Sequence, residues 1–62
     1  MKVTVLILWS NGRSSKDTWD IEHQGERRTM AQEINTALIQ DAVVISSCYP
    51  ETIEEIKSKL GY

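Results

Sequence analysis

The chain has 62 residues, and its seven Lys and Arg against nine Asp and Glu give a formal charge of −2 at pH 7. So short a chain forms one domain, residues 1–62, and buries only roughly 60% of its unfolded surface, so that a partner would help to stabilise it. This charge is neither the basic excess expected of a non-specific nucleic-acid-binding protein nor the acidity expected of a strong DNA mimic, so both classes are disfavoured.

The first predicted element is the apolar run KVTVLILW at residues 2–9. Its residues are β-branched or large and apolar at nearly every position, which is typical of a central strand. Because side chains alternate along a strand, Thr4, Leu6 and Leu8 should share one face and the intervening residues the other. The run is too short to span a membrane and no small-residue cleavage site follows it, so we expect a cytoplasmic protein without a membrane partner.

A hairpin should follow the first strand. The segment SNGRSSKD at residues 10–17 is polar, and its Asn11-Gly12 pair tolerates positive φ and favours a chain reversal. In TWDIEH, residues 18–23, apolar and polar side chains alternate, which predicts an edge strand with one face in water. We therefore expect a hairpin with a long loop over residues 10–17.

A helix is predicted over residues 25–40. Apolar residues recur there at spacings of three and four, as on a helix with one buried stripe, and they are Met30, Ile34, Ala37 and Leu38. Two starts fit the sequence. Gly25 followed by Glu26 suits a first turn, and Thr29 with Gln32 three residues later fits a capping box.

The last two predicted elements are a short strand and a helix. AVVIS, residues 42–46, is a β-branched run and predicts the third strand. The tail, residues 49–62, has acids in its first turns and Gly61 at the position of a C-cap, as expected for a helix. One face of this helix carries its apolar residues, which are Tyr49, Ile53, Ile56 and Leu60.

The order ββαβα predicts an α/β (α+β) fold with a three-stranded sheet in the order 2-1-3. The second strand should pair antiparallel with the first, and a right-handed crossover through the first helix should place the third strand on the other side of the first. This arrangement resembles half of a split βαβ, ferredoxin-like architecture. By the same handedness, the second helix should lie beside the first on one face of the sheet.

With both helices on one face, the other face would expose Thr4, Leu6, Leu8 and Val44. Burying each apolar side chain is worth roughly 1.5–3 kcal/mol, a large amount for a domain of this size. We therefore expect a homodimer with these residues in its interface. The alternative is that the helices straddle the sheet, one on each face, so that residues 2–9 are buried within their own chain.

The sequence offers little for catalysis or metal binding. Cys48 is the only cysteine, so an internal disulfide is excluded, and no cluster of His and Cys suggests a structural zinc site. Cys48 precedes a predicted helix N-terminus that could activate a thiol, and His23 is the only imidazole available as a base. Nothing in the sequence brings the two together. We therefore expect no catalytic, cofactor-binding or metal site, and a packed structural role for Cys48.

A basic and aromatic group surrounds the predicted hairpin. The polar loop lacks the spacing of a P-loop, but with nearby tryptophans and arginines it could bind a ligand or stack the bases of single-stranded nucleic acid. The candidate contacts are Trp9, Asn11, Arg13, Lys16, Trp19, Arg27 and Arg28. Acidic residues on the second strand would repel a phosphate backbone, and packing in a core or interface is the simpler role of the tryptophans.

The main hypothesis from the sequence is a non-enzymatic protein-interaction module, a small regulator or inhibitor that binds another macromolecule. The partner expected is a protein, and no cofactor is implied. One alternative is a nucleic-acid-binding module that uses the basic and aromatic group. The other is a small enzyme that uses Cys48 and His23. The interaction module is the preferred hypothesis because the set of residues required for catalysis is incomplete, whereas the predicted exposed apolar surface needs an explanation.

Overall fold

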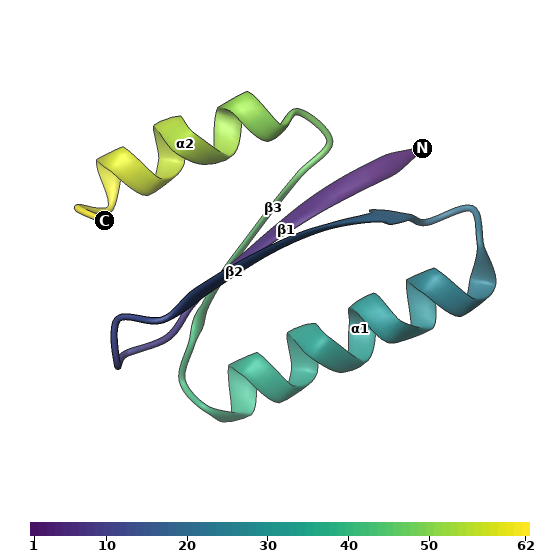
Figure 1. Cartoon of the computed structure of the whole chain (residues 1–62), viewed down its shortest axis with the longest axis horizontal. Helices are drawn as coiled ribbons and strands as arrows, with labels where there is room; N and C mark the ends of the chain where they lie inside the picture. Colours follow the sequence, from purple (N-terminus) through teal and green to yellow (C-terminus); the bar gives the residue numbers. More distant parts are fainter.

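The computed structural model describes all 62 residues, which form a three-stranded sheet and two helices. The elements follow the predicted order (Figure 1) and are β1 (Lys2–Leu8), β2 (Ser14–Asp20), α1 (Gln24–Ile39), β3 (Val43–Ser47) and α2 (Pro50–Lys59). Neither helix is long and apolar enough to cross a membrane.

The apolar strand β1 lies in the middle of the sheet. The sheet order is β2-β1-β3, and both neighbours run antiparallel to β1. Val5, for example, pairs with Asp17 of β2 on one side and with Ser46 of β3 on the other. The predicted α+β class, element order and sheet order are confirmed. Because the sheet is open, β2 and β3 are its edge strands.

The hairpin loop is shorter than predicted. β2 begins at Ser14 rather than at residue 18, so the turn spans residues 9–13. Gly12 adopts a φ of +85° in this turn, and the backbone N–H of Trp9 donates to the carbonyl of Arg13 at 2.9 Å. The polar residues that open β2 can form a strand because an edge strand of an antiparallel sheet need not bury both of its faces.

The helix α1 covers one face of the sheet. Its Ala37 is buried in one cluster with Ile7 of β1, and Met30 and Ile34 pack against this cluster from the same helical stripe. Leu38, which the pattern assigned to the stripe, is 55% exposed. The buried stripe therefore consists of Met30, Ile34 and Ala37.

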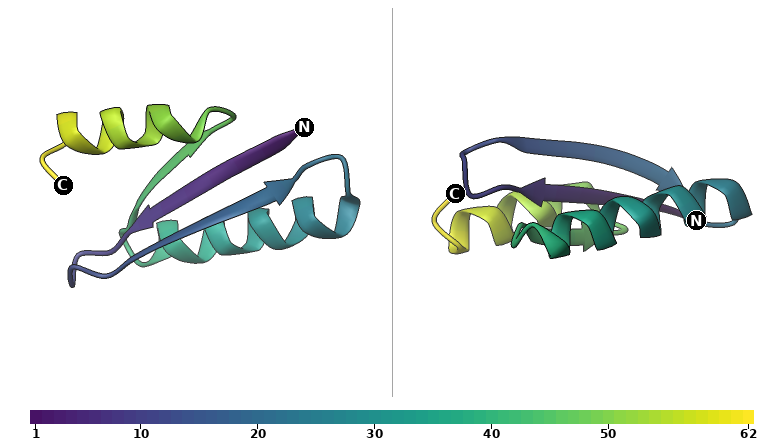
Figure 2. Two further views of the ribbon diagram at one scale, coloured as in Figure 1. Left: turned by 45° about the horizontal axis from the view of Figure 1, so that its top comes forward. Right: turned by 90° about the horizontal axis from the view of Figure 1, so that it is seen from below.

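The helix α2 covers the opposite face, so the predicted placement of both helices on one face is wrong (Figures 1 and 2). Ile53 of α2 is 0% exposed and forms a buried cluster with Leu6 and Leu8 of β1 and Ile45 of β3. The physical reason lies in β1, which has no polar face. A strand that is apolar on both sides needs a covering layer on each, and each helix supplies one.

Three of the four residues predicted to form a dimer interface are buried within the chain, and the fourth, Val44, is half-buried on the other face. Thr4, Leu6 and Leu8 are each at most 4% exposed, on the face that α2 covers. Val44 pairs with Ile7, so it lies on the other face and packs against the cluster beneath α1. The interface prediction is therefore wrong for these residues, and the alternative in which the helices straddle the sheet is correct.

Of the two predicted starts of the first helix, the one at Gly25 is correct to within one residue. α1 begins at Gln24, after a turn at residues 21–23 that was predicted as strand. Gly25 therefore lies in the first turn, whereas Thr29 lies within the helix and donates its hydroxyl to the Gly25 carbonyl at 3.0 Å. α2 ends before Gly61, which adopts a φ of +85° as a C-cap glycine should.

Candidate functional site

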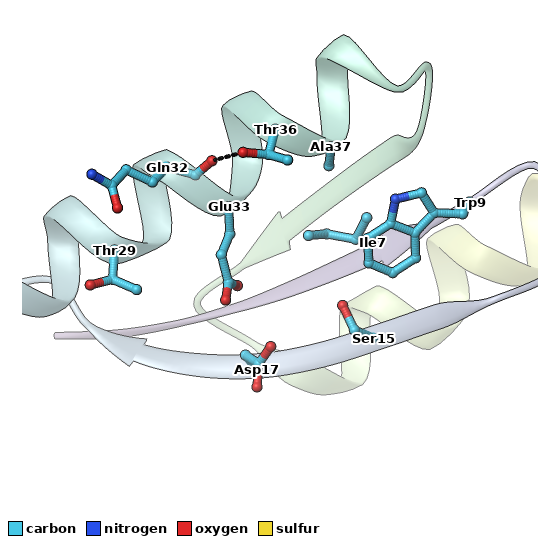
Figure 3. A pocket seen from close by; sticks show the side chains of 9 residues that line it. All are labelled: Ile7, Trp9, Ser15, Asp17, Thr29, Gln32, Glu33, Thr36 and Ala37. Atoms are coloured by element: carbon cyan, nitrogen blue, oxygen red, sulfur yellow. Dashed lines mark hydrogen bonds between the residues drawn. The ribbon is translucent and has the colours of Figure 1, made fainter.

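A groove with a volume of about 370 Å³ lies between β2 and α1. Its floor is apolar and consists of Ile7 from β1, Trp9 from the hairpin turn and Ala37 from α1 (Figure 3). Its walls are polar side chains from the strand and from the helix. A wider depression over α2 is lined by no apolar side chain, so it lacks the apolar contact area that the groove offers.

Ser15 and Asp17 form the strand wall of the groove. Ser15 pairs with Ile7 and Asp17 with Val5, so both lie on the face of the sheet that α1 covers. Farther along β2 the same face carries Trp19, which packs against the apolar cluster beneath α1. The shorter polar side chains of Ser15 and Asp17 leave open the space that Trp19 fills farther along the strand.

The helix wall consists of residues that flank the buried stripe of α1 on the side facing β2. Thr36 donates its hydroxyl to the carbonyl of Gln32 at 2.8 Å, and Thr29 likewise bonds the carbonyl four residues before it. Both hydroxyls are therefore engaged within the helix. Glu33 instead extends from α1 toward β2 and points toward Asp17 (Figure 3).

The carboxylates of Asp17 and Glu33 face the groove without a protein partner. Both residues are exposed, and neither takes part in an ion pair or in a side-chain hydrogen bond. No Lys or Arg lines the groove. The groove therefore presents negative charge above an apolar floor, a combination that attracts a cation with an apolar stem.

A second hollow of about 200 Å³ adjoins the hairpin turn and is lined by Trp9, Asn11, Arg13 and Gln40. Asn11 Oδ1 accepts the backbone N–H of Arg13 at 3.0 Å, which fixes the turn. Trp9 lines both hollows. The surface around the groove thus continues along the Trp9 ring toward the turn.

The two tryptophans do not form one platform. Both pack against the buried cluster beneath α1. Trp19, however, pairs with Val3 near the start of β1, whereas Trp9 follows the end of that strand, so the length of the hairpin separates them. They are therefore not neighbours across the hairpin. Trp19 Nε1 is buried without a hydrogen-bond partner, which costs about 1–3 kcal/mol against its packing role.

The predicted basic residues are also spread over the molecule. Lys16 lies on the α2 side of the sheet, where its Nζ is 3.3 Å from Glu54 Oε1. Arg27 and Arg28 are exposed on the first turns of α1, at the end of the molecule remote from the hairpin turn and Arg13 (Figure 1). Of the seven candidate contacts, only Trp9, Asn11 and Arg13 share a hollow.

Cys48 and His23 are not assembled as a catalytic pair. Cys48 is exposed rather than packed, which corrects the predicted buried position, and its Sγ lies 3.4 Å from Met1 Sδ. His23 contacts Asp20 instead, with 3.5 Å between Nε2 and Oδ2. No hydrogen bond joins the thiol to the imidazole.

Asp20, His23 and Glu26 bring three potential ligand atoms within 4.8 Å of one another at the start of α1. The carboxylates also have partners within the chain. Asp20 Oδ1 accepts the backbone N–H of Glu22 at 3.1 Å, and Glu26 Oε1 accepts that of Asp20 at 3.4 Å. The Glu22 bond lowers the pKa of Asp20, and the nearby Met1 amino group and His23 act in the same direction. These bonds fix the turn between β2 and α1.

Sequence reasoning identified Trp9 but missed Ser15, Asp17 and Glu33. Placing the hairpin loop over residues 10–17 removed the first two from any strand and hid the face on which they lie. Glu33 lies beside the buried stripe of its helix. The available signal was the strand alternation, which would put Ser15 and Asp17 on the face of Trp19 if the strand had been extended toward the turn.

No model of a known protein family, no curated protein and no solved structure matches this chain. Function therefore has to follow from the surfaces of the molecule. Among these, the groove between β2 and α1 has the most specific chemistry, because an apolar floor and two unpaired carboxylates meet there.

Proposed function

We propose that the chain is a non-enzymatic protein-interaction module that binds a segment of another protein in the groove between β2 and α1. The observation that carries this proposal is the groove itself, in which Ile7, Trp9 and Ala37 form a floor beneath polar walls. Binding sites commonly combine apolar contact area with a few polar groups that fix the orientation of the ligand.

The size of the groove favours a short segment of a partner. Its volume of about 370 Å³ accommodates side chains rather than a domain. Trp9 extends the contact surface, since it also lines the hollow at the hairpin turn. Tryptophan is among the residues most often responsible for binding energy at protein interfaces.

By binding a segment of its partner, such a module would block that segment from other contacts, which is how a small regulator or inhibitor acts. We also propose that the protein acts in the cytoplasm, as the sequence led us to expect. The predicted homodimer is not retained, because Leu6 and Leu8 are buried within the chain. Nucleic acid is disfavoured, because the carboxylates of the groove would repel phosphates and the predicted cations are dispersed.

The test is quantitative affinity capture from an extract of the cells that produce the protein. A Thr36→Trp variant places a bulky ring in the groove, whereas Asn35→Trp places the same ring on the neighbouring residue, which does not line the groove. Circular dichroism and thermal unfolding should first show that both variants fold. We expect the wild type and Asn35→Trp to retain the same partner and Thr36→Trp to lose it. Equal retention by both variants would contradict the proposal.

A further inference from the structure

We propose that the groove receives an arginine side chain of the partner protein, with the guanidinium between Asp17 and Glu33 and the methylene stem on the apolar floor. This inference rests on the proposed function and names the chemistry that the groove would recognise. Three properties of the groove support it, namely its charge, its floor and the separation of its carboxylates on two walls.

The charge of the groove defines the sign of the ligand. Asp17 comes from β2 and Glu33 from α1, and no cation of the chain neutralises either carboxylate. A cation placed between them is attracted by both carboxylates. Both carboxylates would repel an anionic or phosphorylated segment, so such a ligand is excluded.

The floor defines the rest of the ligand. Ile7 and Trp9 offer apolar surface to a methylene stem, and long cationic side chains bury such stems while their charged heads stay near polar groups. The Trp9 ring also offers a π face, which attracts a cation placed within about 6 Å of its centre. A small inorganic cation would use the carboxylates but leave this floor uncovered.

The two walls favour arginine over lysine. A guanidinium is planar and carries five N–H donors in a fixed fork, so one group can donate to carboxylates on opposite sides at once. Glu33 points toward Asp17 across the groove (Figure 3), as such bridging requires. An ammonium is a compact point charge with stronger hydration and gains less from this arrangement.

The experiment is an NMR titration of the isotopically labelled full chain with short peptides. The probe is acetyl-Leu-Arg-Leu-amide, and the matched control has citrulline, a neutral isostere, in place of arginine. We expect saturable shifts of the Trp9 indole and of the Gln32 and Glu33 amides. The citrulline peptide should bind at least about five-fold more weakly, which corresponds to about 1 kcal/mol. The lysine peptide should be intermediate.

Variants of the chain test the role of each carboxylate. Asp17→Asn and Glu33→Gln should each weaken the binding of the arginine peptide by about 1.4- to five-fold, the range measured for exposed ion pairs. Glu55→Gln removes the same charge from the exposed side of α2, away from the groove, and should leave the affinity unchanged apart from a small general effect of net charge. Raising the salt concentration should weaken the arginine peptide more than the citrulline peptide.

Several outcomes would overturn the inference. These are the absence of saturable shifts, equal binding of the citrulline or lysine peptide, shifts located away from the groove, or equal losses in all three charge variants. The protein-binding proposal stands or falls separately on the capture experiment. If Thr36→Trp abolished capture while the arginine peptide failed to bind, the groove would be the binding site and arginine the wrong ligand.

Discussion

Lys16 Nζ on β2 lies 3.3 Å from Glu54 Oε1 on α2, so an ion pair crosses the face of the sheet beside Leu6. The relationship shows that α2 reaches across β1 toward the opposite edge strand. The side chains are 45% and 60% exposed, however. Exposed pairs are weak because water screens them and because holding two long side chains costs entropy.

The first prediction concerns this pair. Replacing Lys16 and Glu54 by Ala, singly and together, should give a coupling energy of about 0.2–1 kcal/mol in a double-mutant cycle. The free energies of unfolding would come from urea titrations at low and high salt. The coupling should shrink at high salt, and a coupling that persisted at 1 M salt would contradict the assignment of a screened surface pair.

The second prediction concerns the attachment of α2. Ile53 is fully buried against the sheet, whereas Leu60, the C-cap residue of this helix, is 52% exposed. Ile53→Ala should lower the free energy of unfolding by about 2–5 kcal/mol because it leaves a cavity in the cluster around Leu6. Leu60→Ala should cost much less, since it deletes a half-exposed side chain. Chemical denaturation of the two variants makes the comparison, and similar losses would show that α2 does not pack as described.

The sheet could be predicted because its signals are local. The apolar run around Leu6 identifies a central strand, and short connections with a right-handed crossover leave the order 2-1-3 as the simplest arrangement. The position of α2 could not be derived in this way. A short helix with Ile53 and Ile56 on one side can cover either face of a sheet, and which face is free depends on where α1 has already packed. The deciding signal was the lack of any polar face on β1.

The groove was harder to predict than the fold. It depends on the pairing register, which places Ser15 and Asp17 beneath a helix, and on the rotation of α1, which turns Glu33 toward them. Polar residues at the start of β2 look like a loop in the sequence, because an edge strand with one polar side has no strong apolar pattern. The groove is therefore formed by residues of two separate elements that share no sequence motif, so the sequence alone does not reveal it.

The third prediction is a pH dependence at Asp20. The Glu22 N–H donates to its carboxylate and holds its pKa below the ordinary value of 3.8. Because the folded state then binds a proton less readily than the unfolded state, this contribution is fully present above the unfolded pKa and is lost as the pH falls through the folded pKa. A carbon-13 NMR titration should give a midpoint below 3.8.

The Asp20→Asn variant provides the matching stability measurement. Its melting temperature should fall less than that of the wild type between about pH 4 and pH 2, because Asn does not titrate there. Thermal unfolding followed by circular dichroism across this range is sufficient. Parallel curves for the two chains would mean that Asp20 contributes nothing to the acid sensitivity of the fold.

The two helices end in the same way but with different residues. After α1, the Ala42 N–H donates to the Ala37 carbonyl at 2.9 Å, and Asp41, in the left-handed region with a φ of 57°, bonds Leu38. After α2, the N–H groups of the last two residues make the equivalent bonds, and Gly61 adopts the left-handed conformation. Both ends are Schellman motifs, in which glycine is the usual left-handed residue.

The last prediction compares these two ends. Asp41→Gly should raise the free energy of unfolding by up to about 1 kcal/mol, because glycine removes the cost of a side chain at positive φ, although it gains freedom in the unfolded chain. Gly61→Ala should lower it by about 1 kcal/mol, and a Cβ there would meet no atom within 4 Å, so that the loss is one of backbone conformation alone. Urea unfolding of the two variants measures both effects. A loss of stability in Asp41→Gly would contradict the prediction that relief of backbone strain outweighs the freedom that glycine gains in the unfolded chain.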